Sequence, residues 1–361
     1  MNEMLFIRDG KVYKPSPDVK SIKLNYPTKI YASIGVNGYY IPSVDKPLPR
    51  VLGKTLFKNK GYRNIAYLFA THIGDADQTL VNINGVNVGV NRFWGIQYAC
   101  VDRPSRVPVA IGLGVDDAPH NVSRYELYNR YSPRHAKGSL FLEYATDHTA
   151  FKSYHRYAIK DNVSVAEVGF YYWVNSEFFL LARTILSSPI NRLNYTVYED
   201  GYEIDFPFNY NRNFIEWIYE HLTGLWYQDG NLYGSMLKDI YGNNFICQRN
   251  NPYYGSPDVM IGSDNTTPSL DDYNLLSPIS SLLSQSYGVE IDTYIQECRV
   301  VRQGTYTPST SIELGEIGLF WNVYDVTGVS HKTMFARGVW SPKVTLTAGT
   351  SYTIGIVLKF G

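Results

Sequence analysis

A five-residue stretch that occurs twice decides the fold expected of this chain. It reads Ala166-Glu167-Val168-Gly169-Phe170, and it returns 149 residues later as Gly315-Glu316-Ile317-Gly318-Leu319. Both copies lie in runs where apolar residues alternate with polar or small ones, the pattern of a β-strand with one buried face. The stretch therefore predicts two equivalent strands, each of which carries a glutamate.

Other landmarks recur around this strand in the same order, at offsets of about 147 to 154 residues. First copy against second, they are the helical stretches 63–74 and 212–222, Cys100 and Cys247, 109–112 and 259–262, Tyr125 and Tyr273, Ala182-Arg183 and Ala336-Arg337, and Ser188-Pro189 and Ser341-Pro342. Two unrelated sandwiches would share alternating strands but not this ordered set. We infer an internal duplication.

Each copy opens with apolar residues at helical spacing, and Asn64 and Asn213 stand where a helix N-cap is expected. Short alternating strands and frequent turns follow, without a βαβ rhythm. The expected fold is mainly β. It consists of an N-terminal arm (1–59) and two tandem antiparallel sandwich or jelly-roll-like modules (60–209 and 210–361), each preceded by an amphipathic helix.

The repeated glutamate and arginine predict a structural contact. Glu167 and Arg183 are equidistant from residue 175, and Glu316 and Arg337 from a point in the turn-like stretch 324–328. Each glutamate is therefore expected opposite its arginine on the adjacent strand of a hairpin, where opposite charges specify the register. A catalytic role for such a pair is the weaker interpretation.

Composition excludes some classes of function. The chain has 361 residues, with 33 basic and 33 acidic side chains, and this balance argues against a general nucleic-acid binder. No apolar run has the length of a membrane span, and the first residues lack the apolar core of a signal peptide. Three widely spaced cysteines predict buried free thiols. The 32 tyrosines suit β structure and protein contacts.

No motif for catalysis or cofactor binding stands out. The chain contains no P-loop, nucleophile elbow or zinc-protease motif. The turn from Asp264 to Asp272 is rich in oxygen ligands but lacks the pattern of a calcium loop. We expect neither a metal nor an organic cofactor, and no enzymatic activity.

The second module resembles a known group of proteins. Residues 259–279, VMIGSDNTTPSLDDYNLLSPI, precede a Glu-apolar-Gly strand, an Ala-Arg strand and a closing strand at 349–360. This order is similar to a segment of minor virion proteins of tailed phages and related viruses. The resemblance implies a structural part of a virion, in the tail, neck or baseplate, and it implies no catalytic residues. The first module shows it more weakly, because 115–119 replaces the Thr-Thr-Pro stretch.

The expected function is therefore that of a non-enzymatic virion protein, a ring or adaptor that forms homo-oligomers and contacts other virion proteins. The alternative is a glycan-binding protein that recognises a host receptor. Candidate interface or stacking residues are Tyr39, Tyr40 and Ile41 in the arm, and Tyr171, Tyr172, Trp173, Tyr253 and Tyr254 in the modules. The arm is expected to dock on a neighbouring subunit or on the chain's own modules.

Overall fold

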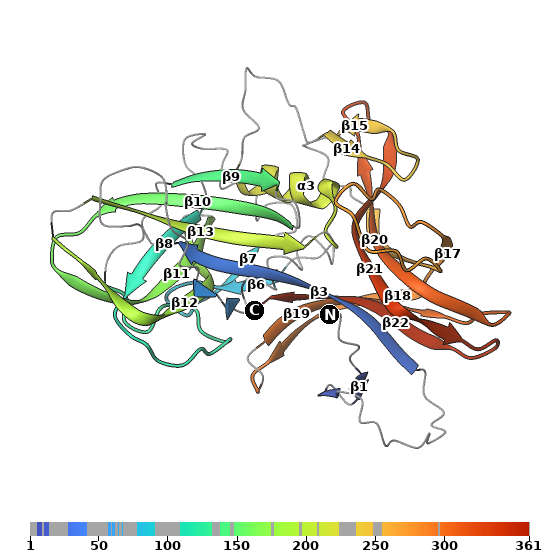
Figure 1. Ribbon diagram of the computed structural model, residues 1–361, viewed down its shortest axis with the longest axis horizontal. Helices are drawn as coiled ribbons and strands as arrows, with labels where there is room; N and C mark the ends of the chain where they lie inside the picture. Colours follow the sequence, from blue (N-terminus) through green and yellow to red (C-terminus); the bar gives the residue numbers. More distant parts are fainter. Residues whose placement is uncertain are drawn as a thin grey trace.

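The structure, a computed structural model, is mainly β, with several antiparallel sheets and one long helix, α3, in the part of the chain that it describes (Figure 1). No described helix combines the length and the hydropathy of a membrane span. The described residues are 6–8, 11–13, 28–41, 57–58, 60–61, 64, 67, 78–90, 109–131, 138–144, 148–174, 177–194, 197–207, 209–223, 236–247, 255–294 and 297–360.

The largest sheet has eight strands, seven of them in the order β18-β19-β22-β3-β13-β10-β9, with β4 paired to β3. The order is symmetric about β3, because β9, β10 and β13 of the first half mirror β18, β19 and β22 of the second. The strands are β3 (Thr28–Ile41), β4 (Phe57–Lys58), β9 (Gly138–Tyr144), β10 (His148–Ala158), β13 (Val197–Pro207), β18 (Leu283–Asp292), β19 (Glu297–Tyr306) and β22 (Tyr352–Phe360).

Strand β3 joins the two halves. Its residues from Thr28 to Val36 pair in parallel with β22, and those from Asn37 to Ile41 pair antiparallel with β13. Figure 1 shows β3 running between these two strands. This segment of the N-terminal arm therefore lies on the chain's own modules, the second of the two expected positions.

Each half also contributes a four-stranded sheet. Three strands correspond, β8, β11 and β12 in the first sheet and β16, β20 and β21 in the second, whereas the fourth strand lies at opposite edges of the two sheets. The first has the order β5-β12-β11-β8, and the second has the order β17-β16-β20-β21. Their strands are β5 (Lys60–Gly61), β8 (Val109–Gly114), β11 (Val163–Val174), β12 (Glu177–Arg192), β16 (Gly255–Gly262), β17 (Pro278–Ser281), β20 (Ile312–Tyr324) and β21 (Ser330–Leu346).

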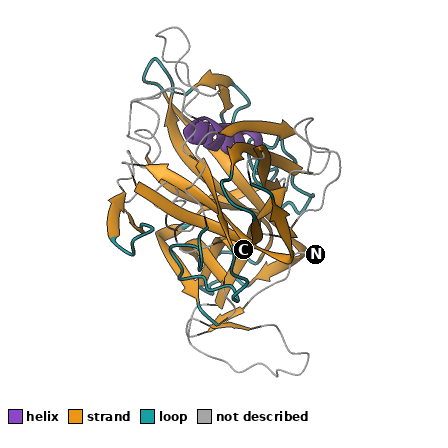
Figure 2. Cartoon of the chain, turned by 90° about the vertical axis from the view of Figure 1, so that its left-hand side faces the viewer, coloured by secondary structure: helices purple, strands orange, loops and turns teal. Residues whose placement is uncertain are grey.

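Three two-stranded sheets complete the described strands. They are β1 (Phe6–Arg8) with β2 (Lys11–Tyr13), β6 (Gln78–Val81) with β7 (Asn87–Val90), and β14 (Met236–Lys238) with β15 (Asn244–Ile246). Figure 2 shows how much of the molecule is strand, with the one helix lying beside the sheets.

Helix α3 (Arg212–Thr223) begins at the first residue of the expected helical stretch, so Asn213 lies inside its first turn. Asn211 is the N-cap, because its side-chain oxygen accepts the Phe214 N–H at 3.2 Å and its carbonyl accepts the Ile215 N–H. The expectation that Asn213 caps the helix was wrong. Of the helix expected at 64–73, only Asn64 and Tyr67 are described, and both are helical.

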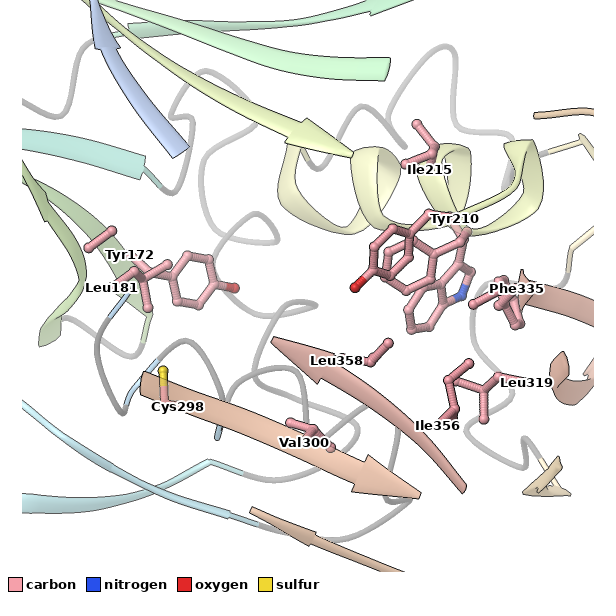
Figure 3. Packing of buried hydrophobic residues seen from close by; sticks show 14 of the residues in the cluster. Tyr172, Leu181, Tyr210, Ile215, Cys298, Val300, Leu319, Phe335, Ile356 and Leu358 are labelled. Carbon is pink, nitrogen blue, oxygen red and sulfur yellow. The ribbon is translucent and has the colours of Figure 1, made fainter. Parts of the chain in front are cut away.

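One apolar core runs through both halves. Its cluster includes Tyr172 and Leu181 from the first half and Trp321, Phe335 and Ile356 from the second. Figure 3 shows side chains from both halves in this region. On β22, Tyr352, Ile354, Ile356 and Leu358 belong to the cluster, so alternate residues of that strand face inward. The shared core and β3 together make the two halves one packed body.

The two halves match in strand register as well as in order. Glu167 pairs with Ile185 and Gly169 with Arg183, and the second half repeats this as Glu316 with Val339 and Gly318 with Arg337. Irregularities fall at the same places in both hairpins. The glutamate is thus diagonal to its arginine rather than directly opposite, because the turn is centred slightly later than expected and one bulge between the pair and the turn shifts the register by a further residue.

The sequence alignment of strand β8 was wrong by two residues. Gly114 pairs with Glu167, and Gly262 pairs with Glu316. Gly114 is therefore the counterpart of Gly262, whereas the Val-x-Ile-Gly pattern had matched Gly112 to it. Repeated glycines in an apolar strand allowed both alignments, and only the pairing distinguishes them.

Candidate functional site

The most specific arrangement of charged groups in the described residues is a buried acid–arginine pair that occurs once in each half. Arg183 Nε donates to Glu167 Oε2 at 2.6 Å, and Arg337 Nε donates to Glu316 Oε2 at 2.7 Å. All four side chains are at most 1% exposed. Both expected ion pairs are present, and their burial makes each partner essential to the other.

Each glutamate also accepts hydrogen bonds from a loop that crosses the outer face of its sheet. Glu316 accepts the Ser277 N–H at 2.7 Å and the Leu276 N–H at 3.1 Å. Glu167 accepts the corresponding N–H groups of Asn129 at 3.0 Å and of Tyr128 at 3.4 Å. The carboxylates therefore attach these loops to the strands, and all the acceptor oxygens are used.

The arginines hold the other end of the same loops. Arg183 donates to the carbonyl oxygens of Ala118 and Asp116, at 2.7 and 3.3 Å. Arg337 donates to the carbonyl of Thr266 and to the carboxylates of Asp264 and Asp272, each at 3.1 Å. The oxygen-rich turn at 264–272 is thus accounted for, because a guanidinium occupies its centre.

Each buried arginine, together with the glutamate and the loop oxygens that it binds, forms what we call a cage. The two cages differ in charge. Arg337 meets three carboxylates, whereas Arg183 meets one carboxylate and lies 4.8 Å from the centre of the Tyr128 ring. Hydrogen bonds from Thr266, and then the charge of Arg337, hold the pKa of Asp264 below its ordinary value. The second cage therefore carries an excess of negative charge around a single guanidinium.

A glycine makes room for each glutamate. A Cβ atom at Gly114 would lie 2.4 Å from Glu167 Oε1, and one at Gly262 would lie 2.4 Å from Glu316 Oε1. Such an approach is impossible without moving the carboxylate. The repeated Gly and Glu are therefore one feature of the fold, although they are far apart in the sequence.

A second polar contact is also duplicated. Asn213 Nδ2 donates to the carbonyls of Lys238 and Met334, and its oxygen accepts the Lys238 N–H at 2.8 Å. Asn64 makes the same three hydrogen bonds, to Val81 and Leu180. Each asparagine thus ties the start of a helix to a small hairpin and to the long strand of its sheet.

A cleft of about 270 Å³ opens beside the N-terminus of α3. Its walls carry charges of both signs. Arg212 is 2.9 Å from Asp271, and the Lys238 ammonium is 5.3 Å from the centre of the Tyr273 ring. The cations and carboxylates that line it are thus already paired with one another or with the cages. In the described part of the chain no three His, Cys, Asp or Glu side chains gather as metal ligands.

Most of the expected interface residues lie elsewhere than predicted or outside the described part. Tyr171 and Tyr172 were expected on a surface, but both are completely buried. Neighbouring strand residues point to opposite faces, and β11 is covered on both, by the main core and by the loop over the sheet. The Tyr171 hydroxyl donates to Glu126 of that loop. Neither tyrosine can serve as a stacking platform.

The remaining candidates are placed only in part. Tyr39, Tyr40 and Ile41 belong to β3, where their backbones pair with β13, and Tyr39 and Tyr40 also pair with β4. The side chains of Tyr39, Tyr40, Ile41 and Trp173 lie outside the described part of the structure. Tyr253 and Tyr254 lie outside it as whole residues. Cys247 and Cys298 are buried free thiols, as expected.

Three turns share one pattern, an Asn or Asp followed by glycine three residues later; sequence reasoning expected the turn within 324–328 and missed the other two. The pattern is found at Asn82, Asp239 and Asp325, with Gly85, Gly242 and Gly328 at positive φ. In each, the side-chain oxygen accepts two N–H groups of its own turn. The spacing was a readable signal of these turns.

Comparison with protein-family models, with curated proteins and with solved structures finds no match to this chain.

Proposed function

We propose that the protein is a non-enzymatic structural component of a virus particle, built from two tandem copies of one helix-and-sandwich module. The duplicated acid–arginine cage carries the proposal. In both halves a Glu and an Arg side chain that could do chemistry are instead engaged in attaching loops to sheets, and in the second half the carboxylates of Asp264 and Asp272 are engaged as well. A protein whose role is to keep a fixed shape benefits from such contacts. Detaching the loop would leave buried charged groups without their partners, and this costs free energy.

The resemblance to minor virion proteins supports the same role. The residues that carry it, 259–279, include the end of β16, the loop gripped by Arg337 and the start of β17. The residues that carry the resemblance therefore include the loop that Arg337 attaches to the sheet of the second module.

Assembly into a ring is part of the proposal. A closed ring in which every chain holds two similar modules offers twice as many quasi-equivalent positions as chains. Such a component can join parts of a tail, neck or baseplate whose symmetries differ. The tyrosine-rich composition is of the kind found at extensive protein contacts.

The decisive experiment is mass spectrometry of purified particles, with the copy number per particle. We expect a stoichiometric copy number that is a multiple of a ring symmetry, and retention after a high-salt wash. Absence from intact particles would refute the proposal. The glycan-binding alternative, which has lost Tyr171 and Tyr172 as platforms, makes a different prediction: specific binding of the isolated protein on a glycan array, at sites outside the cages.

A further inference from the structure

Two turns of the second half lie side by side at one end of the molecule. One joins β14 to β15 and is closed on Asp239, and the other joins β20 to β21 and is closed on Asp325. The Val326 N–H donates to the carbonyl of Ile246 in β15, so the second turn is in direct contact with the β14–β15 hairpin. They expose apolar side chains to solvent, with Tyr241 80% and Val326 50% exposed.

A histidine connects the two turns. His331 Nδ1 lies 3.3 Å from Asp239 Oδ2, and His331 Nε2 lies 3.3 Å from Asp325 Oδ2. Phe245 of β15 stacks on the imidazole, with 4.1 Å between ring centres and 9° between planes. Lys332, the next residue, binds Asp258 instead. The ring thus faces a carboxylate on each of its two nitrogens.

The charge of the ring decides whether both contacts are hydrogen bonds. A protonated imidazole has an N–H for each carboxylate, whereas the neutral ring has one N–H and turns a lone pair toward the other carboxylate. We propose that His331 is a proton-controlled clasp, which joins the two turns when the ring is charged and, when the ring loses its proton, releases one turn or the other according to which nitrogen keeps its hydrogen. The proposal is independent of the proposed function.

The two carboxylates keep their charge while the histidine changes its own. Burial opposes ionisation of both, but hydrogen bonds from Asn243, His331 and Tyr241 lower the pKa of Asp239, and those from Thr327, Val329 and His331 lower the pKa of Asp325 to about 2. Histidine is the side chain whose charge ordinarily changes between about pH 5 and pH 8. The clasp is therefore closed while the ring is protonated and opens as rising pH removes the proton.

The first half contains the same turn without the histidine. By strand register Glu177 takes the place of His331, and Asn82 takes the place of Asp239. Asn82 Nδ2 donates to Glu177 Oε2 at 3.0 Å. An amide and a glutamate do not exchange a proton near neutral pH. The chain thus carries its own internal control, a contact at the equivalent place that holds one turn and does not respond to pH.

Amide hydrogen exchange on the full chain tests the proposal, followed by mass spectrometry and corrected for intrinsic exchange rates. From about pH 5 to about pH 8, protection of peptides covering 239–243 and 325–329 should fall by roughly threefold to tenfold, the range for one partly exposed charged hydrogen bond. The reference peptide covering 82–86 should keep its protection. His331→Gln should remove the pH dependence, and Glu177→Gln should leave it intact.

Three results would overturn the proposal: equal pH dependence of the two halves, no pH dependence in the second, or persistence of the effect in His331→Gln. Asp325→Asn gives a further check, because it removes the carboxylate that faces Nε2. That variant should show weaker pH dependence than the unaltered chain while the turn on Asp239 remains protected.

Discussion

Replacing each buried arginine by methionine should destabilise the protein to different extents, because the two cages differ in charge. Arg183→Met leaves Glu167 buried without a counter-charge, whereas Arg337→Met leaves Glu316, Asp264 and Asp272 together. Removing one partner of a buried ion pair costs about 3–5 kcal/mol. Since Asp264 is 31% exposed and Asp272 14% exposed, water screens part of their repulsion. We therefore expect a loss of about 3 kcal/mol for Arg183→Met and of about 5 kcal/mol for Arg337→Met.

The assay is urea unfolding, with buried Trp217, Trp321 and Trp340 as fluorescent reporters and hydrogen exchange to separate the halves. Arg212→Met is the matched control, because Arg212 is 42% exposed and pairs with Asp271 at the surface; it should cost less than about 1 kcal/mol. The slope with denaturant should stay constant, so that midpoints report stability.

Neutralising the glutamate as well tests whether the charge, rather than the packing, is responsible. Glu167→Gln combined with Arg183→Met should recover much of the loss, because no unpaired charge remains. Glu316→Gln combined with Arg337→Met should recover less, since Asp264 and Asp272 still lack their partner. Losses no larger than that of Arg212→Met, or equal recovery in both halves, would refute the reasoning.

The other predictions concern the glycines beside the buried glutamates, the buried hydrogen bonds of Asn213, and the stability of the protein at acidic pH. Gly114→Ala and Gly262→Ala should each lose about 1–3 kcal/mol by overpacking, measured as urea midpoints. Gly288→Ala, which meets nothing within 4 Å, should lose less. Asn213→Ala should lose about 1–3 kcal/mol, because buried groups of Lys238 and Met334 lose their partner, with faster exchange at 236–247. The pKa of Asp325 falls in the folded chain from 3.8 to about 2. Its stabilising contribution is therefore complete above 3.8 and is lost as the pH falls toward 2; Asp325→Asn should flatten the unfolding midpoint over that interval.

Pairs of residues close in sequence, or repeated in it, were predictable. Glu167 with Arg183 and Glu316 with Arg337 lie on the two strands of a hairpin, so the turn between them nearly specifies their contact. The remaining error was the diagonal register, which follows from the exact centre of the turn together with a bulge near it. A bulge adds one residue to one strand without a distinct composition.

Contacts between distant segments were not predictable in the same way. The alternation along 28–41 indicates a strand, yet it does not indicate that the strand pairs with β22 and with β13. Backbone pairing uses N–H and C=O groups that every residue except proline supplies alike. Tyr171 illustrates the same limit, because its exposure depends on a loop from elsewhere that covers the outer face of β11, whereas Tyr172 faces the main core.

By itself the sequence determined the β character and the need for each buried charge to find a partner, and it predicts a duplication, because periodicity and charge are properties of neighbouring residues. The tertiary structure alone decided that β3 completes a sheet shared by both halves, and that His331 stands between two turns. Those arrangements depend on which distant surfaces bury one another, and that is settled only when the whole core is packed.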